Sequence, residues 1–245
     1  NLKNFGACFT PHGHGHNYIL EAFVSGPLDP ATGLVMNVND LDVHMKAVCG
    51  IFDHKHISFD VPEFDDAIPT TENLAGFIFT RLKKHLLAAH GDLVLHHIRL
   101  YETDDLWAEA GENRSRGVSG ATLTVQAEIR SIHHLENKSY SEEKNRDVYG
   151  ICYGTHGHHY KVQVTCSGPI DSKSGTVINR DQVMKILSEK IVVPYDGVDL
   201  NKRFSNTSCE ALAKEFHEIL KRDLPTMIKV GIQETRKNYF EFPAL

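Results

Sequence analysis

The sequence predicts an α+β protein made of two tandem units, each with the order strand, strand, helix, helix, strand, strand. Two histidine-bearing segments of the 245-residue chain match without gaps, the second lying 142 residues after the first. Each copy is followed by helical patterns and then by an apolar strand pattern. A segment rich in Gly, Ser and Arg separates the copies. A repeat of this length indicates a duplicated structural unit.

The repeat begins with a His-x-His motif and continues through Ser-Gly-Pro to a glycine-containing turn. The first copy holds His14 and His16, and the second holds His156 and His158. Alternate side chains of a strand point the same way, so each pair can offer two imidazoles to one metal ion. A lone pair of this kind is usually polar surface. Two copies at equivalent positions favour metal binding, although catalytic zinc takes about three protein ligands.

In the first unit, the alternation of apolar residues predicts a strand over 18–24, a turn over 29–33 and a short hairpin strand over 34–38. Asn39 or Asp40 is expected to cap a helix. The apolar face of that helix is expected to contain Leu41, Met45, Val48 and Phe52. A second helix opens at residues 70–73, and a closing strand reaches Glu102. The opening strand of this unit is expected before Asn1.

The second unit repeats this order. Strands are expected over 121–135 and 160–166, a helix near Ser208, and a closing strand that reaches Glu234. These patterns place the first unit at residues 1–110, the linker at 111–120 and the second unit at 121–245.

Bulk composition narrows the class of protein. A net charge of −6 and a pI near 6.2 argue against a nucleic-acid binder. No apolar run reaches the length of a membrane span. The five cysteines are an odd number without a secretory segment, which indicates reduced thiols and a cytoplasmic location.

Two cysteines lie just before the histidine motifs. Cys8 precedes His14, and Cys152 precedes His156. A nearby cation lowers the pKa of a thiol, so either residue could supply a thiolate base near neutral pH. The alternative is a buried apolar cysteine, which is the preferred interpretation for Cys49 and Cys166.

Acidic residues add candidates for proton transfer and ligand binding. Asp53 and His54 form a carboxylate–imidazole pair, whereas the second copy has Asp196-Gly197 and lacks the imidazole. Two glutamates of the first copy, Glu72 and Glu102, are matched in the second by Glu210 and Glu234. Glu72 could simply support a helix cap. Glu102 ends an apolar strand, where a carboxylate needs a partner such as the amino-amide edge of a pterin or guanine.

Together these segments resemble the 6-pyruvoyl-tetrahydropterin synthase family. The resemblance spans the first half at family spacing, through residues 8–18, Asp53-His54-Lys55, Thr70-Thr71-Glu72-Asn73 and Tyr101-Glu102-Thr103. The second half is similar more weakly. Its Cys152–His156 spacing is shorter and is similar to the 6-carboxytetrahydropterin synthase branch.

The resemblance implies a tunnelling fold, in which antiparallel sheets join around a barrel and homo-oligomers form active sites at subunit interfaces. It implies Zn2+ held by three histidines. In the second half these are His133, His156 and His158, with His134 as the alternative to His133. In the first half they are His14, His16 and a residue of the missing strand. Cys8 would be the general base, Cys152 its counterpart, Asp53 and His54 the relay, and Glu102 the anchor of the pterin ring. Glu72 matches another substrate-side position.

The implied reaction converts 7,8-dihydroneopterin triphosphate to 6-pyruvoyl-tetrahydropterin with loss of triphosphate. One alternative is formation of 6-carboxytetrahydropterin, on the route to a modified tRNA base. Another is that the second half is a non-catalytic pterin or purine binder. The halves could alternate around one ring or occupy separate rings, and we favour separate rings because the first half retains every motif.

Overall fold

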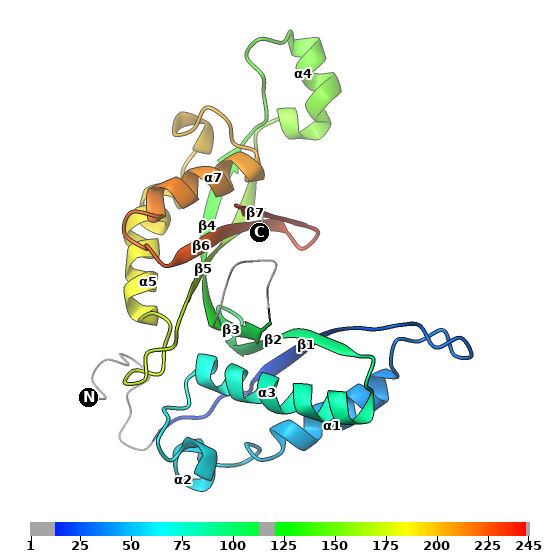
Figure 1. The fold of residues 1–245 in the computed structure, drawn as a ribbon. Coiled ribbons are helices and arrows are strands. Elements are labelled where there is room, and N and C mark those ends of the chain that lie inside the picture. Colours follow the sequence, from blue (N-terminus) through cyan, green and yellow to red (C-terminus); the bar gives the residue numbers. More distant parts are fainter. Residues whose placement is uncertain (1–12, 113–120, 244–245) are drawn as a thin grey trace. The chain divides into compact units, whose positions relative to one another are not determined.

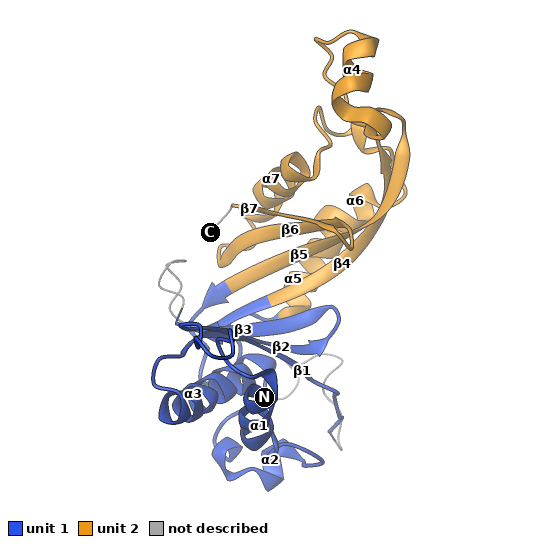
Figure 2. Cartoon of the chain, turned by 90° about the vertical axis from the view of Figure 1, so that its right-hand side faces the viewer, with its two compact units in different colours: residues 1–123, 167–179 blue, residues 124–166, 180–245 orange. Residues whose placement is uncertain are grey.

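The structure is a computed structural model that describes residues 13–112 and 121–243. The chain divides into two compact units (Figure 2). Unit 1 comprises residues 1–123 and 167–179, and unit 2 comprises residues 124–166 and 180–245. Unit 1 thus includes a loop, residues 167–179, that lies in the second copy of the sequence repeat. Each unit combines antiparallel strands with helices, which confirms the α+β class.

Unit 1 contains a sheet covered by helices. The sheet has the order β1-β2-β3, with β1 at Ile19–Ser25, β2 at Val94–Thr103 and β3 at Leu106–Gly111. The helices are α1 at Val38–Cys49, α2 at Ile57–Asp60 and α3 at Thr71–Ala89. Helix α3 packs against β2 and β3, and α1 packs against α3 (Figure 1).

Helix α3 begins and packs as the sequence predicts. The Thr70 hydroxyl accepts a hydrogen bond from the Asn73 amide at 3.2 Å, which caps the helix. Its buried face repeats with helical spacing and consists of Leu74, Ala75, Ile78, Leu82 and Leu86. This packing fixes the first turn of α3, where Thr71 and Glu72 lie.

The expected hairpin strand over 34–38 is wrong. The Asp29 amide donates to the Leu34 carbonyl at 2.9 Å, which closes a turn, and the Asn37 side chain accepts from the Asn39 amide and caps α1. Helix α1 therefore begins before the expected caps Asn39 and Asp40. It also ends before Phe52, whose ring packs 5.5 Å from that of Phe77 instead.

Unit 2 has longer strands. Its strands follow the order β4-β5-β6-β7, with β4 at Ala121–His133, β5 at His156–Gly168, β6 at Met227–Thr235 and β7 at Asn238–Phe242. The helices are α4 at Glu142–Tyr149, α5 at Arg180–Leu187, α6 at Val193–Tyr195 and α7 at Cys209–Leu220. Helix α4, between β4 and β5, was not expected from the sequence. Helix α7 packs against β6 and β7, and Ser208 caps it as predicted.

Candidate metal centre

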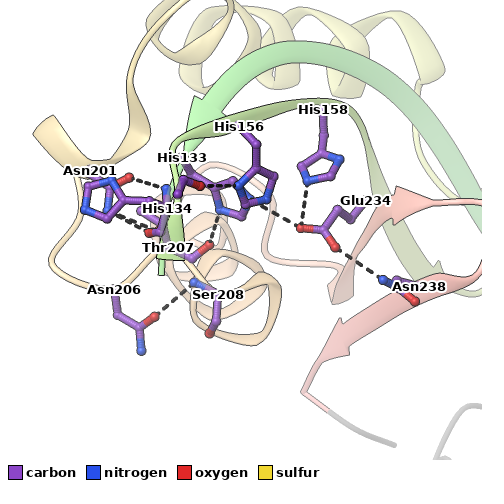
Figure 3. Close-up of polar contacts among 11 residues, drawn as sticks. His133, His134, His156, His158, Asn201, Asn206, Thr207, Ser208, Glu234 and Asn238 are labelled. Carbon is purple, nitrogen blue, oxygen red and sulfur yellow. Dashed lines mark hydrogen bonds and ion pairs between the residues drawn. The ribbon is translucent and has the colours of Figure 1, made fainter. Parts of the chain in front are cut away.

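Two neighbouring strands bring three histidines together in unit 2. His133 ends β4, and His156 and His158 occupy alternate positions at the start of β5. One nitrogen of each ring lies within 4.8 Å of the others, so the three side chains could hold a metal ion (Figure 3). His134, the alternative to His133, lies apart from this cluster, with its Nε2 3.8 Å from Glu136 Oε1.

The hydrogen bonds of two rings leave nitrogen lone pairs facing each other. His133 Nδ1 lies 3.0 Å from the Thr207 carbonyl, and His156 Nδ1 lies 2.7 Å from the Gly154 carbonyl. A carbonyl can only accept, so each Nδ1 carries a proton, and in the neutral form of either ring the Nε2 lone pair is available to a ligand. These two Nε2 atoms lie 3.1 Å apart. A shared cation would satisfy both lone pairs, and backbone carbonyls commonly orient metal-binding histidines in this way.

His158 completes the set. Its Nε2 is buried and makes no hydrogen bond among the described residues, although Glu234 Oε1 lies 3.4 Å away. Burial lowers the pKa of His133 and of His158, which keeps both rings neutral and able to bind a metal. Three neutral imidazoles are a typical ligand set for zinc. The residues present therefore fit the metal that the sequence predicts.

Glu234 lies beside this cluster at the end of β6. Its Oε1 is 3.5 Å from His133 Nε2, and its Oε2 is 3.4 Å from Asn238 Nδ2. Cys209, in the first turn of α7, is also hydrogen-bonded to this carboxylate, and burial together with the Glu234 charge raises the pKa of its thiol. The carboxylate is thus held next to the candidate metal site.

The first copy of the repeat places two corresponding histidines near its glutamate in unit 1. The rings of His14 and His16 lie 4.6 Å apart, and His16 Nε2 is 3.5 Å from Glu102 Oε1. The Thr71 hydroxyl donates to Glu102, at the position that Cys209 occupies in the second copy. Sequence reasoning missed Thr71 and Cys209, although each precedes a glutamate that it singled out. Cys8 lies outside the described residues, and the third ligand of this copy stays a prediction.

The expected relay pair is formed in unit 1. His54 Nδ1 lies 2.8 Å from Asp53 Oδ1, and both side chains are largely exposed. The His54 backbone has φ 54°, a left-handed conformation that is strained for a residue other than glycine. Gly197, its counterpart in the second copy, has φ 73° without that strain. Strain retained at His54 is typical of a functional position.

In the second copy, the acid that corresponds to Asp53 has a different partner. Asp196 accepts hydrogen bonds from the backbone amide of Arg130 at 2.7 Å and from its Nη2 at 2.6 Å. These bonds from Arg130 lower the pKa of Asp196 to about 2. The acid is therefore paired with a guanidinium rather than with an imidazole.

The four described cysteines are all free thiols. Cys152 lies half-buried in a 3₁₀ turn, Gly150–Tyr153, and its carbonyl accepts from the Leu135 amide at 2.8 Å. Cys166 is buried, which raises the pKa of its thiol to about 11. Cys49 is half-buried, and burial raises the pKa of its thiol as well. The last two fit the interpretation as apolar packing residues.

The two helix-start glutamates differ in environment. Glu72 is only 2% exposed, and its Oε1 accepts from the Val177 amide at 3.1 Å. Burial, with a smaller contribution from the Glu102 charge, raises the pKa of Glu72 to about 7. Glu210 is exposed. The two glutamates occupy equivalent positions of the sequence repeat. Their burial differs because the loop 167–179 covers only Glu72.

Fold and site together define an α+β protein in which three histidines beside a glutamate could hold a metal ion, and in which a His-x-His motif beside a glutamate recurs in the first copy. A family model described as 6-pyruvoyl tetrahydropterin synthase matches residues 2–113 and 122–244. The chain belongs to this family. No helix among the described residues is long and apolar enough to cross a membrane.

Individual relatives match about half of the chain. The 6-pyruvoyl tetrahydrobiopterin synthase of Pongo abelii is 48% identical over 106 residues, covering 43% of this chain and 70% of the relative. The 6-carboxy-5,6,7,8-tetrahydropterin synthase of Bacillus subtilis is 25% identical over 133 residues, covering 45% and 91%. The solved Caenorhabditis elegans 6-pyruvoyl tetrahydropterin synthase has a TM-score of 0.48 at 26% identity, covering 51% of this chain and 95% of that one.

Proposed function

We propose that this chain is a zinc-dependent lyase that converts 7,8-dihydroneopterin triphosphate to 6-pyruvoyl-tetrahydropterin and releases triphosphate. The observation that carries this proposal is the pairing, in both copies, of a His-x-His motif with a strand-end glutamate. The two distances are 3.5 Å for His16–Glu102 and 3.4 Å for His158–Glu234. A metal and a ring-binding carboxylate are then close enough to act on one small substrate.

The chain's own residues have separate roles in this proposal. Bound zinc would act as a Lewis acid toward the substrate side chain. His133, His156 and His158 would hold it in the second copy, and His14 and His16 with a third ligand in the first. The carboxylates of Glu102 and Glu234 accept hydrogen bonds from the donor edge of the pterin and fix the ring. Glu72 and Glu210 lie in the first turns of α3 and α7.

Proton transfer is assigned to the first copy. Cys8 is the base, and the Asp53–His54 pair relays its protons, with the carboxylate orienting the imidazole. Cys152 is the counterpart of Cys8. The reaction is an internal rearrangement, so this mechanism requires no external redox cofactor. The two copies, residues 1–110 and 121–245, are proposed as tunnelling-fold units of a homo-oligomer in the cytoplasm, joined by a linker at 111–120.

The second copy is the better candidate for a non-catalytic pterin or purine site. Gly197 replaces the relay histidine, and Asp196 is held by Arg130. Both differences remove proton transfer and leave the three-histidine cluster and Glu234 in place. Metal and heterocycle binding could therefore persist in this copy without turnover.

Product analysis tests the proposed function. The zinc-loaded chain is incubated with 7,8-dihydroneopterin triphosphate, and the pterin products are separated and identified. We expect 6-pyruvoyl-tetrahydropterin and one triphosphate per substrate consumed. Formation of 6-carboxytetrahydropterin would assign the chain to the alternative reaction, and an unchanged substrate would contradict both enzymatic assignments.

A further inference from the structure

Three histidines outside the candidate metal centre gather where helix α3 of unit 1 ends against α1 (Figure 1). His44 lies on α1, His85 lies near the end of α3, and His90 is the residue that follows the last residue of α3 as its cap. The ring centroid of His44 lies 6.3 Å from that of His85 and 5.7 Å from that of His90. We call these three residues the helix-end histidines. The proposed function assigns no role to them.

The helix-end rings are arranged much like the rings of the candidate metal centre. In that centre the ring centroids of His133, His156 and His158 lie 4.5 Å, 4.9 Å and 5.3 Å apart, and two of the three pairs are close to perpendicular, at 73° and 88°. The His44 ring lies at 78° and 86° to the other two helix-end rings. The helix-end centroids are slightly further apart, so a shared ion requires the side chains to rotate towards one another.

The environment of the three side chains permits this rotation. His85 is exposed, and His44 and His90 are half-buried. No hydrogen bond or ion pair to the described part of the chain holds any of the three imidazoles in its orientation. An exposed side chain exchanges between staggered rotamers, so His85 can turn a ring nitrogen towards His44 without disturbing the core.

The end of α3 also favours a cation. The last carbonyl groups of a helix carry partial negative charge, because the peptide dipoles align along the helix axis. The last turn of α3 contains no basic side chain that would offset this charge. The His90 amide donates to the Leu86 carbonyl at 2.7 Å, which holds His90 against that turn. A positive ion among the three rings would therefore lie in a favourable field.

The second copy of the repeat has no equivalent cluster. Helix α5, Arg180–Leu187, follows the loop of the second copy as α1 follows that of the first, and it contains no histidine. Helix α7, the counterpart of α3, has 12 residues instead of 19, so it ends before the positions that correspond to His85 and His90. The repeated unit therefore folds without these three histidines, which favours a binding role for them over a structural one.

We propose that His44, His85 and His90 form a further metal site, which binds Zn2+ and ties the end of α3 to α1. Neutral imidazole nitrogens suit this ion, and three of them suffice when water completes its coordination. The ion would join two helices that are adjacent only in the folded chain, so its binding stabilises unit 1. The inference rests on these residues and is independent of the proposed activity and of the candidate metal centre in unit 2.

Titration of the full chain with Zn2+, in competition with a chromophoric chelator, counts the bound ions and measures their affinity. His85→Gln removes one ligand at an exposed position, and His44→Gln removes the ligand on α1. We expect the wild type to bind one more ion per chain than either variant at micromolar free zinc. Each variant should weaken the binding of this ion roughly tenfold or more, because loss of even an outer partner of a ligand has an effect of that size.

Two further variants separate this site from other histidines. His159→Gln removes an exposed histidine of unit 2 outside both clusters, and it should bind zinc like the wild type. The double variant His156→Ala with His158→Ala should still bind the ion that His85→Gln loses. Failure of the candidate metal centre and failure of the helix-end site therefore give different ion counts.

Urea unfolding gives a second readout that does not depend on turnover. Trp107 is buried in β3 of unit 1, so its fluorescence follows the unit that contains the helix-end histidines. Zinc should raise the unfolding midpoint of the wild type more than that of His85→Gln, because the ion binds the folded chain. Equal ion counts and equal zinc-dependent midpoints in the two proteins would overturn the proposal. Binding of the additional ion only at millimolar zinc would also overturn it, since that result would indicate adventitious surface binding.

Discussion

Glu72 makes the stability of unit 1 depend on pH, and Glu72→Gln isolates this dependence. Burial raises the pKa of Glu72 from 4.5 to about 7. Between these values the folded chain holds a proton that the unfolded chain has released, so the free energy of unfolding falls as pH rises. The Glu72 contribution is fully present below pH 4.5 and is lost as the pH passes about 7.

The size of the effect follows from the shift. Each pKa unit corresponds to about 1.36 kcal/mol, so a shift from 4.5 to about 7 amounts to roughly 3 kcal/mol. The side chain is 2% exposed, so solvent screens the effect very little. Glutamine keeps an oxygen that accepts from the Val177 amide and cannot ionise. We therefore expect Glu72→Gln to gain roughly 3 kcal/mol relative to wild type between pH 5 and pH 8.

Urea unfolding at several pH values measures this gain. The single tryptophan, Trp107, is buried in β3 of unit 1, so its fluorescence reports on the unit that contains Glu72. Protein concentration is held constant, because association changes apparent stability. Asp66→Asn, at an exposed loop position, is the control and should follow the wild type at every pH. If the free energy of unfolding had the same pH dependence in wild type and in Glu72→Gln, the argument would be refuted.

Four further predictions concern the two copies of the site. His156→Ala with His158→Ala should lose metal by elemental analysis, whereas His134→Ala should retain it; unchanged zinc in the double variant would contradict the assignment. Glu102→Gln replaces an acceptor with a group that also donates, so the dissociation constant for dihydroneopterin should rise roughly tenfold or more, and unaltered binding would leave the glutamate a purely structural role. Asp196→Asn should be less stable than wild type at pH 5, and the difference should vanish as the pH falls from 3.8 towards about 2, because the lowered pKa of Asp196 stabilises the fold only while the group is ionised. Cys8→Ala should reduce turnover by about two to four orders of magnitude while Cys152→Ala retains most of it, and the opposite result would favour halves that alternate around one ring.

Local signals in the sequence were sufficient for the His-x-His pair of the cluster and for the starts of α3 and α7. His156 and His158 share a strand face through alternation, and Thr70 and Ser208 cap helices because hydroxyl side chains satisfy the first free amides. His133 was predicted as the third ligand through the family resemblance. The structure places it beside His156 and His158. Each of these features depends on a few neighbouring residues or on a shared motif.

Features that depend on distant packing were not predictable in the same way. Residues 34–38 have a strand-like composition, yet Asn37 caps α1 two residues earlier than the equally suitable Asn39. The burial of Glu72 depends on Val177, which lies 105 residues further along the chain. No local pattern indicates which of two equivalent glutamates a distant loop covers, and the raised pKa of Glu72 follows from that contact.

The two copies of the site have diverged in complementary directions. The first retains His54 in a strained backbone conformation, together with Asp53 and a covered Glu72. For a residue other than glycine, a backbone conformation of this kind costs on the order of 1 kcal/mol or more. The equivalent position of the second copy is Gly197, which shows that the fold itself does not require a histidine there. The second copy lacks the histidine of the proposed relay but has three imidazoles that could hold a metal ion, two of which have Nδ1 hydrogen-bonded to a backbone carbonyl. The first copy therefore retains the residues that we propose for proton transfer, whereas the second retains the histidine cluster and the glutamate that we propose for metal and heterocycle binding.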